Sequence, residues 1–257
     1  MSFTALIFAV AAIILIATLA MLEIGRRLGA RHAVQGTEAA GGAVEGSVFA
    51  LLGLLIAFTF SGAISRFDSR RELVAEEANR IGTAWLRIDL LPEREQPNLR
   101  DLFRRYLDSR LATFRKIGAE GKMPEAEIAE TARLQGDIWK TAVAACRSAD
   151  SLMPCLLLLP ALNDMIDITT TRAMAARIHP PPIVFIMLGI LAFTSAFLAA
   201  YGMAAAGKAH DLFHRIAFAF VIAATVYVII DIEYPRLGLI RLDSADSVLS
   251  DLRQTMK

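Results

Sequence analysis

Apolar residues gather in four long runs along the chain, separated by segments that carry most of the charge. The first two runs, residues 3–22 and 46–65, contain no Asp, Glu, Lys or Arg. A helix needs roughly 20 apolar residues to cross the hydrocarbon core of a bilayer. Both runs therefore predict membrane-spanning helices. A cleaved signal peptide is the alternative for the first run, but no positive charge precedes it.

The third and fourth runs, residues 183–206 and 212–231, form a second pair of predicted spans. The fourth is the weaker, because it contains Arg215, whose side chain must extend toward the membrane interface. The third is rich in small residues that let helices approach closely, namely Ala192, Ser195, Ala196 and Ala199.

Between the second and third runs, residues 66–179 carry apolar side chains at helical spacing, interrupted by prolines. We expect about four helices here, the first continuing from the second run without a break. One buried stripe is predicted at Leu99, Phe103, Tyr106, Leu107, Leu111 and Phe114. A second is predicted at Ile128, Leu134, Ile138 and Trp139.

These patterns predict an all-α membrane protein with four transmembrane helices and a cytosolic helical domain between the second and third. The predicted domains are a first transmembrane hairpin (1–65), the cytosolic helical domain (66–179), a second hairpin (180–231) and a cytosolic C-terminal segment (232–257).

Composition agrees with membrane insertion and argues against nucleic-acid binding. Hydrophobic residues make up 55% of the chain, against about 45–50% in soluble domains. The 27 Lys and Arg nearly balance the 26 Asp and Glu. No strong overall field therefore attracts nucleic acid.

The distribution of Arg and Lys near the ends of the runs predicts orientation, because cytoplasmic loops carry the excess. The richer side has Arg66, Arg70, Arg71, Arg80, Arg172, Arg177, Arg236 and Arg241. The other side has Arg26, Arg27, Arg31 and Lys208, with Arg215 close by. We expect a multi-pass membrane protein with both termini in the cytoplasm.

The chain contains no sequence signature of catalysis or of a metal centre. It has no GxSxG, HExxH, GxxxxGK[ST] or GxGxxG motif. The four histidines lie near predicted membrane edges, where we interpret them as interfacial anchors. Acidic pairs such as Glu76-Glu77 and Asp164/Asp167 lie among arginines, so solvated ion pairs are expected. We predict no enzyme activity, no catalytic residue, no metal and no cofactor.

Cys146 and Cys155 belong to no CxxC pair and no cluster with histidine, so a structural metal is not expected. We expect both to be reduced, facing the cytosol. A disulfide would require an oxidising compartment.

The second run carries a polar and apolar stripe at helical spacing. The stripe consists of Ser47, Leu51, Leu54, Phe58, Ser61 and Ser65. In a ring of such helices, the apolar middle would form a neck that gates by dewetting, and the hydroxyls would help to solvate ions on either side. The alternative is that Ser and Gly here only allow close helix packing.

Two stretches resemble the bestrophin ion channels. In LLGLLIAFTFSGAISRFDSRRELVAEEANRIGTAWL, the matching features are Leu52-Gly53, Phe58 and the Arg66-Phe67 pair that enters a long helix. After the fourth run, DIEYPRLG is similar to the Ile-Glu-x-Pro-x-x-Gly of bestrophins. The closer resemblance is to the bacterial bestrophin-like domain family, through FSGAISRFDSRRELVAEEANRIGTAWLRIDLLP and YPRLGLIRLD.

The resemblance implies a homopentamer with a central pore whose neck is formed by Leu54 and Phe58, with Ala50 or Leu51 as a further contributor. One departure concerns calcium. Calcium-binding bestrophins follow the Pro-x-x-Gly with a dense acidic cluster, whereas this chain offers only Asp243 and Asp246. A rigid calcium site needs about six to eight oxygen ligands, so we expect none.

Charges that follow the stripe bear on ion selectivity. From residue 66 to residue 77 the chain has three positive and four negative charges. Glu72 and Glu76 facing a vestibule would favour cations, whereas Arg66 and Arg70 facing it would favour anions.

We therefore predict a homo-oligomeric, pentameric ion channel of the bacterial inner membrane, cation- or anion-selective, whose partners are other copies of itself, membrane lipid and small permeating ions. A non-conducting membrane sensor or scaffold is the alternative, and an enzyme ranks third.

Overall fold

The computed structural model describes residues 3–34, 42–120, 124–148, 151–206 and 212–256. Lys208 and His210 lie outside these residues. All regular elements within the described ranges are helices, as the apolar periodicity predicts. The chain divides into two compact units. Unit 1 comprises Met1–Ser65 and His179–Tyr234, and unit 2 comprises Arg66–Ile178 and Pro235–Lys257.

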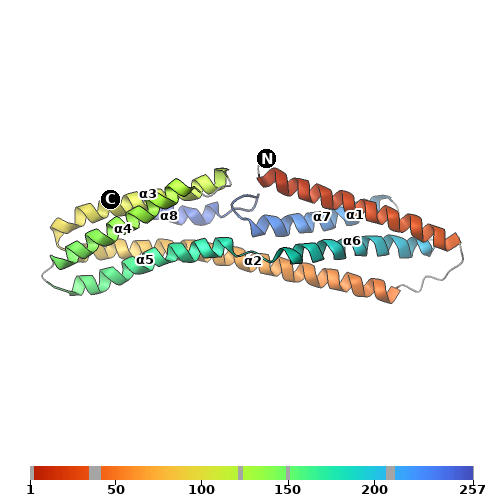
Figure 1. The fold of residues 1–257 in the computed structure, drawn as a ribbon, viewed down its shortest axis with the longest axis horizontal. Helices are drawn as coiled ribbons and strands as arrows, with labels where there is room; N and C mark the ends of the chain where they lie inside the picture. The colour runs from red at the N-terminus through yellow and green to blue at the C-terminus, as the bar shows by residue number, and fades with distance from the viewer. Residues whose placement is uncertain (1–2, 35–41, 121–123, 149–150, 207–211, 257) are drawn as a thin grey trace. The chain divides into compact units, whose positions relative to one another are not determined.

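Unit 1 contains the apolar helices. It consists of α1 (Phe3–Val34), the first part of α2 (Gly42–Arg87), α6 (Pro182–Ala205) and α7 (Leu212–Glu233). α1 packs along α6 and α7 (Figure 1). Among the described residues, four stretches are long and apolar enough to cross a membrane, and they include these helices.

The contact between α1 and α6 depends on two glycines. A Cβ atom at Gly25 would lie 2.3 Å from the carbonyl oxygen of Phe197, and one at Gly29 would lie 2.3 Å from that of Tyr201. Only a residue without a side chain allows the backbones to come this close. On α6, Ala192, Ser195 and Ala196 are buried in the same chain. The small residues of the third run therefore do permit close packing, and they are covered within one copy.

α1 is longer than the sequence pattern suggests. The predicted span ends at residue 22, but the helix continues to Val34, through a segment that contains Gly25 and Gly29. Glycine normally weakens a helix interior. Here Gly25 and Gly29 are needed for contact with α6, so tertiary packing offsets their low helix propensity.

Unit 2 is a bundle built from the second part of α2, α3 (Gln96–Glu120), α4 (Glu125–Arg147), α5 (Met153–Arg177) and α8 (Asp243–Thr255). Short 3-10 helices at Ile88–Leu90 and Glu93–Glu95 link α2 to α3. α3 packs against α4 and α8, and α4 packs against α5 (Figure 1).

The first predicted stripe is the centre of the unit 2 core. Leu99, Phe103, Tyr106 and Leu107 are fully buried, Leu111 is nearly so, and Phe114 packs against the same cluster. Only two of the four residues in the second predicted stripe are buried. Leu134 and Ile138 are buried, whereas Ile128 and Trp139 are more than a third exposed, because they lie on the outward side of α4.

α2 is a single helix from Gly42 to Arg87, which confirms the prediction that the second run continues into the charged block. Its buried positions recur at helical spacing. In unit 1 these are Leu52 and Ala63, and in unit 2 they are Arg70, Val74, Glu77, Ala78, Ile81, Ala84 and Trp85.

Candidate functional site

The predicted neck residues lie on an exposed face of α2 in unit 1. Leu51 is 54% exposed, Leu54 52% and Phe58 68%. At about 100° per residue, the three fall on one side of the helix, turned away from buried Leu52 and Ala63. Large apolar side chains are thus left uncovered by the single chain.

The hydroxyl residues of the stripe lie on the same exposed side. Ser47, Ser61 and Ser65 are all exposed. The Ser47 hydroxyl donates to the Ala43 carbonyl at 2.9 Å, one turn earlier in the helix. Its oxygen lone pairs remain available to other donors or cations.

The four predicted vestibule residues divide between the two sides of α2 in unit 2. Glu72 is exposed, and Glu76 is 45% exposed and pairs with Arg80. Arg66 is half-buried. Arg70 is only 8% exposed and donates to the carbonyls of Ala175 at 3.1 Å and Ile178 at 2.9 Å.

Glu77 forms a buried ion network that the sequence interpretation did not identify. We expected the Glu76-Glu77 pair to be solvated, but Glu77 is fully buried. Arg110 of α3 donates to one of its carboxylate oxygens at 2.6 Å, and Arg172 of α5 donates to the other. One carboxylate therefore joins three helices of unit 2.

The charges of this network shift the pKa values of its members. Burial raises the pKa of the Glu77 carboxyl, but the attraction of Arg110 and Arg172 outweighs burial and leaves the pKa below its ordinary value. Burial lowers the pKa of Arg172, and although the attraction of Glu77 opposes this, the pKa stays below its ordinary value, with repulsion by Arg110 and Arg236 adding to the lowering.

The C-terminal segment belongs to the same network. Arg236 binds Asp246 through two hydrogen bonds of 2.7 and 3.0 Å. The guanidinium groups of Arg110, Arg172 and Arg236 all lie over the ring of Phe114, at 4.8, 4.2 and 4.8 Å. Cations over an aromatic face are attracted by its quadrupole.

A sequence signal for buried Glu77 did exist. Positions 74, 77, 81, 84 and 88 follow helical spacing, and all of them except Glu77 are apolar. A carboxylate on an apolar stripe is buried if the stripe is. The density of neighbouring arginines concealed this signal.

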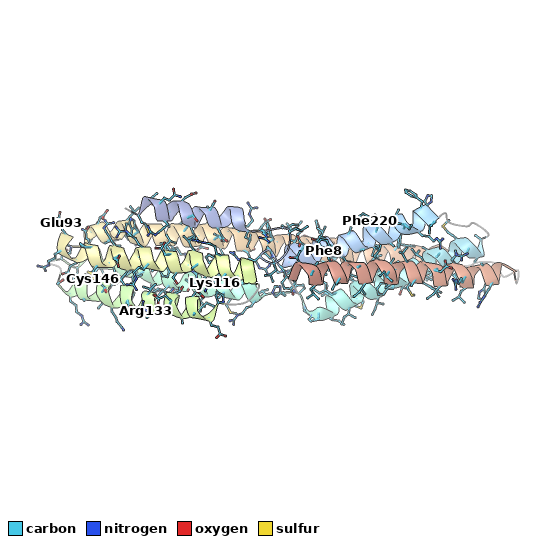
Figure 2. All side chains as sticks on the ribbon, turned by 90° about the horizontal axis from the view of Figure 1, so that it is seen from above. Phe8, Glu93, Lys116, Arg133, Cys146 and Phe220 are labelled. Atoms are coloured by element: carbon cyan, nitrogen blue, oxygen red, sulfur yellow. A yellow bond between two sulfur atoms is a disulfide. The ribbon has the colours of Figure 1, made fainter. Side chains whose placement is uncertain are left out.

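The prediction of reduced cysteines is wrong. Cys146, in the last turn of α4, is joined to Cys155, in the first turn of α5, by a disulfide (Figure 2). Their Cα atoms lie 5.6 Å apart, a separation that suits a disulfide. The turn between α4 and α5 brings together two positions that the sequence shows only as nine residues apart.

One histidine has a specific partner rather than a general interfacial role. The Nδ1 atom of His179 lies 2.9 Å from a carboxylate oxygen of Glu233, which is only 1% exposed. The His179 ring stacks on Tyr234 at 4.6 Å. All three residues belong to unit 1.

Among the described residues, no group of three or more His, Cys, Asp or Glu side chains could hold a metal ion. Asp246 directs both carboxylate oxygens to Arg236. The absence of a calcium site stays a prediction, because the side chain of Asp243 lies outside the described part.

The observed architecture defines an all-helical membrane protein whose second apolar helix extends into a charged bundle. Three crystal structures of a bacterial bestrophin homolog from Klebsiella pneumoniae share this fold, with TM-scores of 0.70, 0.71 and 0.69 at 14% sequence identity. The alignments cover 95–96% of this chain and 97–98% of the homolog. No curated protein matches the sequence.

A family model described as the bestrophin-like domain matches residues 11–246. The chain therefore belongs to the bestrophin-like domain family.

Proposed function

We propose that this protein is a homo-oligomeric, pentameric ion channel in which α2 lines the pore. Membership of a family related to the bestrophin ion channels supports a channel rather than an enzyme. In this proposal Leu51, Leu54 and Phe58 form the apolar neck, and Ser47, Ser61 and Ser65 line its polar ends.

The observation that carries the proposal is the exposed apolar face of α2. Phe58 is 68% exposed, more than half of Leu51 and Leu54 is exposed, and three hydroxyl residues share their side of the helix. Hydroxyls at helical spacing on this side offer oxygen lone pairs to water or ions. A ring of these faces around an axis gives an apolar constriction with polar ends.

The test is the conductance of the full chain reconstituted in planar bilayers. Replacing Phe58 with Ala should widen and wet the neck, and so raise open probability or leak several-fold. Ile56→Ala is the matched control, because Ile56 lies on the same turn of α2 and outside the stripe. Equal effects of Phe58→Ala and Ile56→Ala would show that the stripe is not the neck. Absence of unitary currents from wild type would favour the sensor or scaffold instead.

Assembly is tested separately by native mass spectrometry in mild detergent. The proposal requires a pentamer. A monomer in several detergents and lipids would contradict it. The small-residue face of α6 is packed against α1 in the same chain. Contacts between copies must therefore use other surfaces.

Selectivity depends on which charges of α2 face the conduction path. Glu72 and Glu76 share the side of the apolar stripe by helical spacing, which favours cations. Arg66 is half-buried, and Arg70 has carbonyl partners, so Arg70 contributes only as a fixed charge beneath the surface. The resemblance to the bestrophins, many of which conduct anions, favours anions instead. The reversal potential in a KCl gradient decides between them, and Glu72→Lys/Glu76→Lys should shift it toward anions. An unchanged permeability ratio would exclude these glutamates as the selectivity determinant.

We also propose that unit 2 and both termini face the cytoplasm of a bacterial inner membrane, since Arg and Lys concentrate on that side. The disulfide between Cys146 and Cys155 argues in the opposite direction, because disulfides persist mainly in oxidising compartments. Alkylation of intact cells with a membrane-impermeant maleimide, at a cysteine introduced at exposed Lys140 in the Cys146→Ser/Cys155→Ser variant, decides the matter. Labelling only after cell lysis supports the cytoplasmic orientation. Labelling in intact cells would reverse it.

A further inference from the structure

One end of unit 1 has an excess of guanidinium groups around a single carboxylate. Glu23 of α1 accepts from Arg26 at 2.7 and 2.9 Å, from Arg27 at 2.7 Å and from Arg215 of α7 at 2.8 Å. These four residues, the guanidinium cluster, carry three positive charges and one negative charge. Both oxygens of Glu23 accept two hydrogen bonds each.

The carboxylate has no acceptor capacity left for the remaining donors. A carboxylate offers about four lone-pair sites, and each guanidinium offers about five N–H groups. Glu23 is thus saturated by four hydrogen bonds, while most N–H groups of the cluster are not used by it. The Nε atom of Arg215 is buried without a hydrogen-bond partner. The other described acid at this end, Glu45, lies against the backbone of Gly202 instead.

The cluster lies where the apolar runs end. α1 has no charged residue before Glu23, and the apolar run of α7 begins directly after Arg215. This position corresponds to the membrane interface, where phosphate groups of lipids are the abundant acceptors. Arg pairs with phosphate through two parallel N–H bonds more readily than Lys does.

The outward face of α1 continues from these arginines into apolar side chains. Ile13 is 63% exposed, Ile16 65% and Ile24 46%, while the Arg27 side chain is 69% exposed. At about 100° per residue, all four lie on one side of the helix. A single face therefore offers an apolar track that ends at an exposed guanidinium, which matches a lipid acyl chain followed by its phosphate.

We propose that this face of unit 1 is a binding site for an anionic phospholipid. The phosphate binds Arg27 with support from Arg26 and Arg215, and an acyl chain lies along Ile13, Ile16 and Ile24. The carboxylate of Glu23 acts as a positioning residue, since it holds the three guanidinium groups together. The site is independent of ion conduction.

The test uses the full chain in mild detergent, titrated with phosphatidylglycerol or phosphatidylcholine and observed by native mass spectrometry. Wild type should retain phosphatidylglycerol more strongly than phosphatidylcholine. Arg27→Gln should reduce this retention about fivefold, the effect of one cation near an anionic lipid surface. Arg27→Lys keeps the charge but loses the paired N–H donors, so its retention of phosphatidylglycerol should lie between those of wild type and Arg27→Gln.

Arg133→Gln is the matched control, because Arg133 is half-exposed and pairs with acids on a helix of unit 2 (Figure 2). It should leave lipid retention unchanged. Equal retention of the two lipids by wild type, or equal effects of Arg27→Gln and Arg133→Gln, would overturn the proposal. Displacement of phosphatidylglycerol by millimolar inorganic phosphate would also overturn it, because the site would then select free phosphate rather than lipid.

Discussion

The helices of the two units pack through different kinds of side chains. In unit 1, glycines and alanines bring α1 and α6 into close contact, and large apolar side chains such as Phe8 and Phe220 remain exposed (Figure 2). In unit 2, aromatic and branched side chains fill a core, and a carboxylate with two arginines is buried within the bundle.

This difference follows from the surroundings that each unit requires. Where lipid covers the outside, apolar exposure costs nothing and helices associate through shape. Where water covers the outside, burial of apolar surface stabilises the bundle, and buried charges must be paired. Substitutions should therefore act through shape in unit 1 and through charge and volume in unit 2.

Replacing the buried carboxylate of Glu77 should have the largest effect on stability. Glu77→Gln leaves Arg110 and Arg172 buried without a counter-charge, which should cost about 3–5 kcal/mol of stability in unit 2. Chemical denaturation followed by Trp fluorescence measures this, since Trp85 lies in the same core. Glu76→Gln, at a half-exposed ion pair, should cost less than about 1 kcal/mol. Similar losses in both variants would show that the network is not buried.

The Glu77 network also predicts that the stability of unit 2 falls at low pH. Because the pKa of Glu77 is lower in the folded state than its ordinary value, its contribution is complete above the ordinary pKa of about 4.3. The contribution should be lost as pH falls through the folded pKa. In Glu77→Gln this part of the acid sensitivity should disappear, as measured by unfolding at a series of pH values.

The disulfide should contribute less than the ion network. It closes a short loop, with a sequence separation of nine, and such a cross-link stabilises by roughly 2.5 kcal/mol in the chain-entropy model. Cys146→Ser/Cys155→Ser should lower the unfolding temperature of oxidised protein. Reduced wild type should match the variant. If oxidised wild type and the variant unfold alike, the cross-link is absent in solution.

Adding a methyl group to the α1–α6 contact should destabilise unit 1 by shape alone. In Gly25→Ala the new Cβ would lie 2.3 Å from a backbone carbonyl oxygen, and overpacking of this kind costs about 1–3 kcal/mol. Gly189→Ala is the control, because its Cβ would meet nothing closer than 3.9 Å. Thermal unfolding in detergent compares the two. Equal unfolding temperatures would show that the helices are not in close contact.

The smallest effect on stability is expected at the exposed stripe. Phe58→Ala should change the free energy of unfolding of dissociated single chains by less than about 0.5 kcal/mol, because the side chain is 68% exposed. Leu52→Ala, at a buried position on the same helix, should cost several times more. A large loss in Phe58→Ala would place this residue in an intramolecular contact and remove it from the proposed neck.

The sequence by itself determined the helical class, the four apolar runs and the family. An uncharged apolar run of about 20 residues crosses a bilayer as a helix, which hydrogen-bonds its own backbone groups. The stripe from Leu99 to Phe114 predicted the buried face of α3. No proline separates the second apolar run from the start of the charged block, so the sequence predicted that α2 is one continuous helix. These features are local, so they depend only on spacing along the chain.

Only the tertiary structure decided which polar groups meet. Glu76 and Glu77 look alike in sequence, yet one is half-exposed and the other binds arginines from two further helices. Cys146 and Cys155 meet because a turn brings two helix ends together. Gly25 and Gly29 lie inside α1 because the backbone of α6 is too close to them for a side chain. Each depends on contacts between residues distant in sequence, which spacing along one helix does not specify.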